Sequence, residues 1–127
     1  MNKQNFKTQL YQLNNYENEQ SEVIYAGNPN SKEVIVFIHG ALLTYKIMTM
    51  FEPYMREYKL IFINCPSRGK SSEIERDNHT LDDYSERVYD VLSQIVTEQQ
   101  LSEITVVGYS MGGMIAVSYT HLTLPTI

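Results

Sequence analysis

The serine at position 110 has the sequence surroundings of a nucleophile. It lies in the stretch Ile104-Thr-Val-Val-Gly108-Tyr-Ser110-Met-Gly112-Gly113, where a β-branched run ends in G-x-S-x-G. This pattern predicts a strand, a sharp turn and the start of a helix. Gly108 and Gly112 would leave room where side chains would meet neighbouring backbone. The Ser110 hydroxyl would be exposed in a strained conformation, and the N–H of Met111 would face the same space at the positive end of a helix, which suits an oxyanion. A Gly-Ser turn without chemistry is the alternative.

Three apolar runs predict the elements that position this serine. They cover residues 34–38, 60–63 and 104–107, and such runs are typical of strands buried on both faces of a parallel sheet. Between them, apolar residues recur at helical spacing over 44–52 and 80–100. This order predicts an α/β fold, with a mostly parallel sheet, flanking helices and right-handed crossovers.

Both predicted helices carry an apolar face. The first should end or kink at Pro53, and its apolar positions are Ile47, Met50, Phe51, Tyr54 and Met55. In the second, Thr80 followed by Asp83 is a capping-box pattern. Its apolar positions are Leu81, Tyr84, Val88, Val91, Leu92 and Ile95. Upstream, residues 6–13 and 22–26 are predicted as short strands, and the polar stretch 65–78 as a loop.

Composition limits the class of protein. The chain has 127 residues and a formal charge of −5, which predicts one domain and argues against a nucleic-acid surface. The one cysteine, Cys65, excludes an intrachain disulfide framework and fits a reducing compartment. No apolar signal-peptide core begins the chain, and no run approaches the roughly 20 residues needed to span a bilayer. We therefore expect a soluble, cytoplasmic protein without a membrane partner.

Two further motifs accompany the serine. His39-Gly40 closes the first apolar run, and Asn64-Cys-Pro66-Ser-Arg-Gly69-Lys-Ser71 follows the second. With G-x-S-x-G closing the third run, the segment from about Val34 to Ala116 resembles the first half of an α/β-hydrolase domain. The middle motif resembles the D-x-P-G-x-G-x-S loop of that family and departs from it at Asn64 and Ser67.

The resemblance implies a role for each motif residue. Ser110 would be the nucleophile, and the N–H groups of Met111 and Ala41 would form the oxyanion hole. His39 would be structural rather than the general base, as would the motif glycines Gly40, Gly108 and Gly112. The substrate pocket would be walled by Leu42, Leu43, Tyr45 and Tyr109, for which core packing is an equal alternative. No cofactor or metal is implied, and we interpret His79, beside Asp77, as part of a solvated loop.

The part of the sequence after the serine lacks the other groups that such a nucleophile needs. In this fold the acid and the histidine follow the serine, but the chain has no Asp or Glu after Ser110, and its one later histidine is His121. We therefore interpret residues 1–116 as the N-terminal part of an α/β-hydrolase domain, inactive alone. Residues 117–127 are poor helix material and can be written in codons that resemble a transposon-end adapter of sequencing libraries. We predict that they are a non-native tail, which leaves His121 without a catalytic role.

These observations predict a fragment of a serine-dependent α/β-hydrolase. The parent enzyme would act on a small-molecule ester, thioester or related acyl substrate through an acyl-serine intermediate. One alternative is a non-catalytic binding protein of the same fold. Another is a nucleotide binder, because Gly69-Lys70-Ser71 follows an apolar strand, although Asn64 occupies the position where a P-loop needs glycine. The oligomeric state has no sequence signal here.

Overall fold

A computed structural model describes residues 6–75, 77 and 79–120 of the chain. Its elements in chain order are β1 (Lys7–Gln12), β2 (Gln20–Gly27), β3 (Val34–Ile38), the 3₁₀ helix η1 (Tyr45–Tyr54), β4 (Lys59–Ile63), α1 (Leu81–Gln99), β5 (Thr105–Gly108) and α2 (Met111–Thr120). His121 and the remainder of the predicted tail lie outside the described residues. Residues 117–120 form the end of α2, so the helix continues into that tail. No helix in the described part is long and apolar enough to cross a membrane.

The five strands form one mixed sheet in the order β1-β2-β4-β3-β5. β3 pairs in parallel with both β4 and β5, as the three apolar runs predict. The two N-terminal strands add antiparallel pairings, β1 with β2 and β2 with β4. The α/β class is therefore confirmed, and the parallel part of the sheet is limited to β4, β3 and β5.

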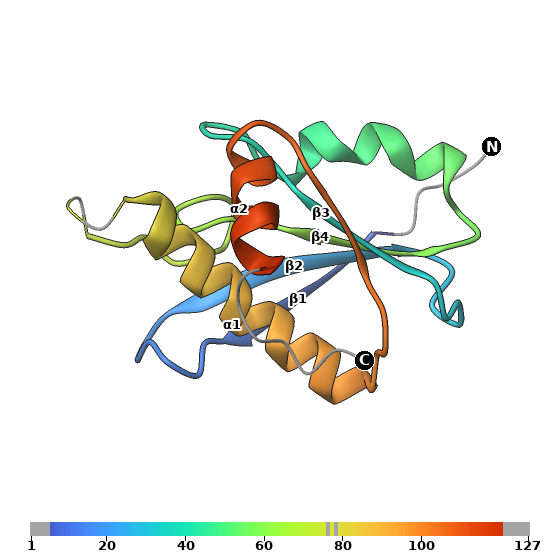
Figure 1. Cartoon of the computed structure of the whole chain (residues 1–127), viewed down its shortest axis with the longest axis horizontal. Helices are drawn as coiled ribbons and strands as arrows, with labels where there is room; N and C mark the ends of the chain where they lie inside the picture. Colours follow the sequence, from blue (N-terminus) through green and yellow to red (C-terminus); the bar gives the residue numbers. More distant parts are fainter. Residues whose placement is uncertain (1–5, 76, 78, 121–127) are drawn as a thin grey trace.

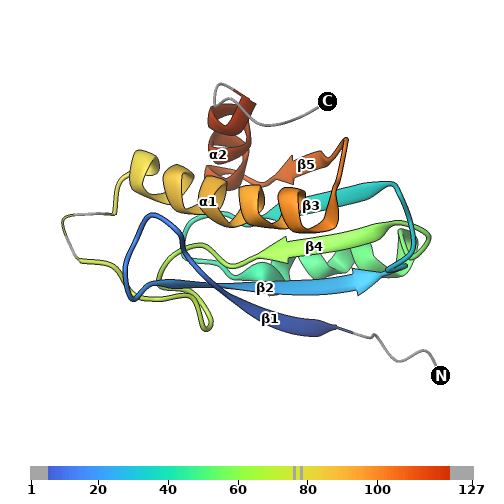
Figure 2. The ribbon, with the colours of Figure 1, turned by 90° about the horizontal axis from the view of Figure 1, so that it is seen from below.

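Helices cover both faces of this sheet. α1 and α2 lie on one face and η1 on the other (Figures 1 and 2). Because successive strand residues point to opposite faces, Val36 and Ile38 of β3 pack on the α1 side, whereas Ile35 and Phe37 pack on the η1 side. This double coverage explains why β3 and β4 are apolar at almost every position. β5 has β3 as its single partner in the described sheet, so Thr105 is exposed and Val106 is half-buried, contrary to the predicted full burial.

The helix predicted after β3 is present as η1, but the prediction of its buried face is partly wrong. Tyr45, Met48 and Phe51 turn toward the sheet, and Phe51 stacks on Phe37. These three residues are spaced by three because η1 is a 3₁₀ helix, with three residues per turn instead of 3.6. In the predicted set, Met55 also packs on the core, whereas three side chains face solvent: Ile47 is 44% exposed, Met50 64% and Tyr54 84%.

The second predicted helix agrees closely with α1. Thr80 is its N-cap, and the Asp83 side chain completes the capping box. Its predicted apolar positions are buried, except Leu81, which is 39% exposed in the first turn. Gln100 ends the helix in a left-handed conformation, with φ of 54°. Figure 2 shows that α1 starts above the end of the sheet where β4 ends.

Candidate active site

The turn between β5 and α2 holds Ser110 in a strained conformation. β5 ends at Gly108 and α2 begins at Met111, so two residues join strand to helix. Ser110 has a φ of 56°, in the left-handed region that side chains other than glycine rarely adopt. The Tyr109 N–H donates to the Ile38 carbonyl at 3.0 Å. This bond attaches the turn to the carboxyl end of β3, where the side chain of Ser110 is exposed.

Two glycines permit this turn by letting backbones touch. A Cβ atom on Gly108 would lie 2.2 Å from the Gly112 carbonyl oxygen, and one on Gly112 would lie 2.0 Å from the Ile38 carbonyl oxygen. Such separations are far inside van der Waals contact, and the atoms that would be hit belong to backbone. Any other residue at either position would force α2 away from the sheet.

The loop after β3 lies directly against the serine. A Cβ atom on Gly40 would be 3.0 Å from Tyr109 Cδ2 and 3.4 Å from Ser110 Cβ. Leu42, two residues later, has a φ of 63° and is 85% exposed. Ala41 and Met111, the two predicted oxyanion donors, line one cavity of about 400 Å³. The fold thus brings together backbone from the ends of β3 and β5, which are about 70 residues apart in sequence.

The four predicted pocket residues do not gather around this cavity. Leu42 lines it. The Tyr45 ring instead packs near Phe62, and its backbone N–H donates to Asn64 Oδ1 at 2.8 Å. Leu43 is half-buried and donates its N–H to the Gly40 carbonyl, while Tyr109 is 55% exposed beside the serine. Their assignment to the substrate pocket therefore stays a prediction, with geometric support for Leu42 alone.

His39 is buried, and both of its ring nitrogens have partners. Nδ1 donates to the Gly40 carbonyl at 2.8 Å, and Nε2 accepts from the Cys65 N–H at 3.0 Å. One donor and one acceptor describe a neutral imidazole, and burial lowers the pKa of His39. The ring ties the loop after β3 to the loop after β4. This arrangement agrees with the structural role that the resemblance implies and leaves no nitrogen for the serine hydroxyl.

The loop after β4 folds back on itself instead of opening a phosphate site. The Lys70 N–H donates to Glu22 Oε1 at 2.8 Å, and Ser71 Oγ donates to the Asn64 carbonyl and accepts from the Glu22 N–H. A carboxylate beneath the loop repels phosphate, and the Ser71 hydroxyl is buried between two backbone partners. α1 begins only at Leu81, whereas a P-loop leads straight into its helix. This geometry argues against the nucleotide-binding alternative.

Six residues that line this cavity were not predicted as site residues. They are Arg68, His79, Thr80, Leu81, Tyr84 and Met114. The His79 Nδ1 atom lies 2.7 Å from the Tyr84 hydroxyl, and its Nε2 donates to the Ile74 carbonyl at 3.2 Å. Tyr84 was predicted as core from its spacing on α1. The position of Arg68, inside a motif that resembles a known loop, was the one signal that pointed toward the site.

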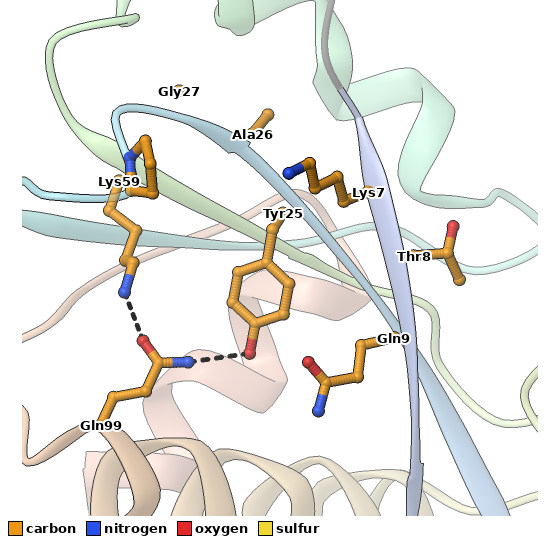
Figure 3. A pocket seen from close by; sticks show the side chains of 9 residues that line it. Lys7, Thr8, Gln9, Tyr25, Ala26, Gly27, Lys59 and Gln99 are labelled. Carbon is orange, nitrogen blue, oxygen red and sulfur yellow. Dashed lines mark hydrogen bonds between the residues drawn. The ribbon is translucent and has the colours of Figure 1, made fainter.

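Another cavity lies away from the serine. It measures about 500 Å³ and opens beside β1, β2 and the end of α1. Figure 3 shows Lys59 and Tyr25 there, both hydrogen-bonded to the side chain of Gln99. The Gln99 side chain therefore joins these two residues of the cavity wall. Within the described part of the chain, no group of three or more His, Cys, Asp or Glu residues could hold a metal ion.

The sequence matches a known family over most of its length. Residues 33–126 match the family described as alpha/beta hydrolase fold. The chain belongs to this family. A Bacillus subtilis (strain 168) protein provisionally named 2-succinyl-6-hydroxy-2,4-cyclohexadiene-1-carboxylate synthase is 29% identical over 98 residues, which are 76% of this chain and 34% of that protein. A Mycoplasma genitalium (strain G37) protein provisionally named esterase/lipase 2 is 26% identical over 99 residues, 74% of this chain and 35% of that one.

The fold of this alpha/beta hydrolase segment recurs in solved structures. A lipase-esterase related protein from Clostridium acetobutylicum ATCC 824 superposes with a TM-score of 0.73 at 27% identity, over 83% of this chain and 42% of that one. The hydrolase segment spans about a third of the length of the curated relatives.

Proposed function

We propose that Ser110 is the nucleophile of an acyl-transfer reaction, in a protein that hydrolyses an ester, thioester or related acyl compound. The observation that carries the proposal is the strained, exposed Ser110, whose chain neighbour Met111 lines one cavity together with Ala41. The names of two relatives, esterase/lipase and lipase-esterase related protein, support an ester substrate. The chain belongs to the alpha/beta hydrolase fold family, and the attack by Ser110 is the part that we propose.

The proposed mechanism begins with attack of the Ser110 hydroxyl oxygen on the substrate carbonyl carbon. The carbonyl oxygen becomes negatively charged and accepts hydrogen bonds from the N–H groups of Ala41 and Met111, each of which contributes about 3 kcal/mol to transition-state stability. The start of α2 adds the positive end of its dipole. Collapse of this intermediate expels the alcohol or thiol and leaves an acyl-serine, which water then hydrolyses to the free acid.

A base must take the proton of Ser110, and the described residues supply none. His39 is buried and uses both nitrogens, and the His79 ring is held by Tyr84 and Ile74. In this family the acid and histidine follow the serine in chain order. We therefore propose that both come from the segment of the relatives that this chain does not span. From the codon pattern we also propose that residues 117–127 are non-native.

The test uses the protein translated from an independently sequenced gene. We expect a fluorophosphonate probe to label Ser110, as located by peptide mass spectrometry, and Ser110→Ala to abolish both labelling and hydrolysis of 4-nitrophenyl esters. Ser102→Ala, an exposed serine before β5, is the matched control and should keep both. Full ester hydrolysis by Ser110→Ala would overturn the proposal. A folded but unlabelled wild-type protein would instead favour a non-catalytic binding protein.

A further inference from the structure

A cationic side chain, Arg68, lines the same cavity as the two oxyanion donors. Neither Asp nor Glu occurs among the described residues of its lining, and Arg68 is the permanent cation among them. Of the other lining residues, Ala41, Leu42, Leu81, Met111 and Met114 are apolar. His39, His79, Thr80 and Tyr84 supply the remaining polar part of the wall. The cavity volume of about 400 Å³ lies in the range of small-molecule sites.

The guanidinium group of Arg68 has little to bind within the chain. Among the described residues, its side chain makes one hydrogen bond, from Nη1 to the Ser67 carbonyl at 3.1 Å. The ion pairs among the described residues instead join Arg56 to Glu52 and Arg87 to Glu19 and Asp83. A guanidinium carries five N–H donors in a planar fork, so most of the donors of Arg68 remain for a ligand.

The backbone holds Arg68 in place beneath the cavity. Its N–H donates to the Cys65 carbonyl at 3.1 Å, and its carbonyl accepts from the Ser71 N–H at 2.9 Å. The residues on either side, Ser67 and Gly69, both have left-handed φ angles. The charge acts on the cavity wall, because burial raises the pKa of the Tyr84 hydroxyl and the nearby Arg68 opposes that rise.

We infer that Arg68 binds a carboxylate on the acyl part of the substrate, so that the substrate is a half-ester or half-thioester of a dicarboxylic acid. The reasoning is one of complementarity. The N–H groups of Ala41 and Met111 would hold the reacting carbonyl, the apolar part of the wall would contact methylene groups, and Arg68, a planar cation without an acidic partner, lines the same cavity. Arginine binds carboxylate through two parallel hydrogen bonds. This inference rests on the proposed function of Ser110.

The experiment compares two esters that differ in one charge. Mono-4-nitrophenyl adipate has a free carboxylate, and methyl 4-nitrophenyl adipate has the same chain with that carboxylate capped. In the protein from the sequenced gene, we expect kcat/KM to be higher for the half-ester. Arg68→Gln should lower kcat/KM for the half-ester about tenfold or more, which is the usual effect of losing a charge-assisted hydrogen bond. It should leave the capped ester nearly unchanged.

Lys70→Gln is the matched control for this substitution. It removes the same charge from the same loop, but Lys70 is exposed and does not line the cavity. We expect it to keep the preference for the half-ester. Fluorophosphonate labelling of Ser110 in Arg68→Gln shows that the variant is folded and its serine reactive.

The possible failures are distinguishable. Equal losses for both esters in Arg68→Gln, or a wild-type preference for the capped ester, would overturn the carboxylate inference while Ser110 still labels. Absence of Ser110 labelling in the folded wild-type protein would overturn the proposed function, and this inference with it.

Discussion

Asn64 Nδ2 donates a 2.9 Å hydrogen bond to Glu22 Oε1, and both residues are buried. The Asn64 Oδ1 atom accepts from the Tyr45 N–H, so one amide links β2 to the start of η1, which follows the loop that carries Gly40 and Ala41. The resembling family motif has aspartate at position 64. Aspartate could accept from Tyr45 but could not donate to Glu22, so the departure from the motif is explained by the carboxylate beside it.

Asn64→Asp should therefore destabilise the protein. It places two carboxylates at hydrogen-bond distance in a buried site, where the lost bond and the like-charge contact cost about 2 kcal/mol or more. Urea unfolding at neutral pH measures the loss. The double variant Asn64→Asp with Glu22→Gln should recover much of it, because the introduced glutamine amide can then donate to the introduced carboxylate. Equal stability of Asn64→Asp and the wild type would contradict this account.

The two neighbouring glycines of α2 should respond oppositely to alanine. Gly112→Ala would place its Cβ atom 2.0 Å from the Ile38 carbonyl oxygen, so we expect a loss of at least about 3 kcal/mol or failure to fold. Gly113→Ala meets its nearest atom at 3.5 Å, an ordinary contact, and should stabilise the helix by about 0.5–1 kcal/mol. Thermal unfolding of both variants checks the pair. Similar effects at the two positions would mean that α2 does not approach β3 this closely.

The left-handed conformation of Ser110 should cost stability. Glycine adopts this conformation freely, whereas a side chain is strained there. Ser110→Gly and Ser110→Ala both lack the hydroxyl, but the glycine variant should be more stable by about 1 kcal/mol. The comparison of their melting temperatures isolates the backbone. A more stable alanine variant would place Ser110 in ordinary helical backbone.

His39 should make the protein less stable as pH falls. Burial lowers its pKa below the ordinary value of 6.5, so the unfolded chain takes up a proton before the folded chain does. Its contribution to stability is complete above pH 6.5 and is lost as pH decreases below that value. In His39→Gln, which retains one donor and one acceptor, the free energy of unfolding should depend less on pH in this window. An NMR titration of His39 with an ordinary pKa would refute the assignment.

The 127-residue chain should react slowly with a fluorophosphonate. A serine hydroxyl is a weak nucleophile without a base, and no described histidine is hydrogen-bonded to Ser110. We expect labelling to be orders of magnitude slower than in the protein from the sequenced gene, measured side by side at one probe concentration. Equal rates would show that the chain already contains its base.

Local patterns in the sequence predicted most of the elements around the site. The apolar runs predicted β3, β4 and β5, the capping box predicted the start of α1, and the spacing of Gly108 and Gly112 predicted the turn at Ser110. These succeed because each leaves a recognisable pattern in consecutive residues, even where the contacts that require it, such as the one between Gly112 and Ile38, join residues far apart in sequence. The predicted apolar face of η1 was partly wrong because a 3₁₀ helix has three residues per turn. Over so short a segment, the sequence pattern does not distinguish three residues per turn from 3.6.

The sequence by itself determined that a serine would stand in a strained turn between a strand and a helix. The tertiary structure decided what surrounds it. Both ring nitrogens of His39 are hydrogen-bonded, and the Asn64 amide donates to Glu22. Arg68 lines a cavity together with Ala41 and Met111. The physical reason is the order of the strands in the sheet. β5 and β4 lie on either side of β3, so the loops that follow these three parallel strands meet at their carboxyl ends. Which side chains converge there depends on which strands are neighbours and not on spacing along the sequence.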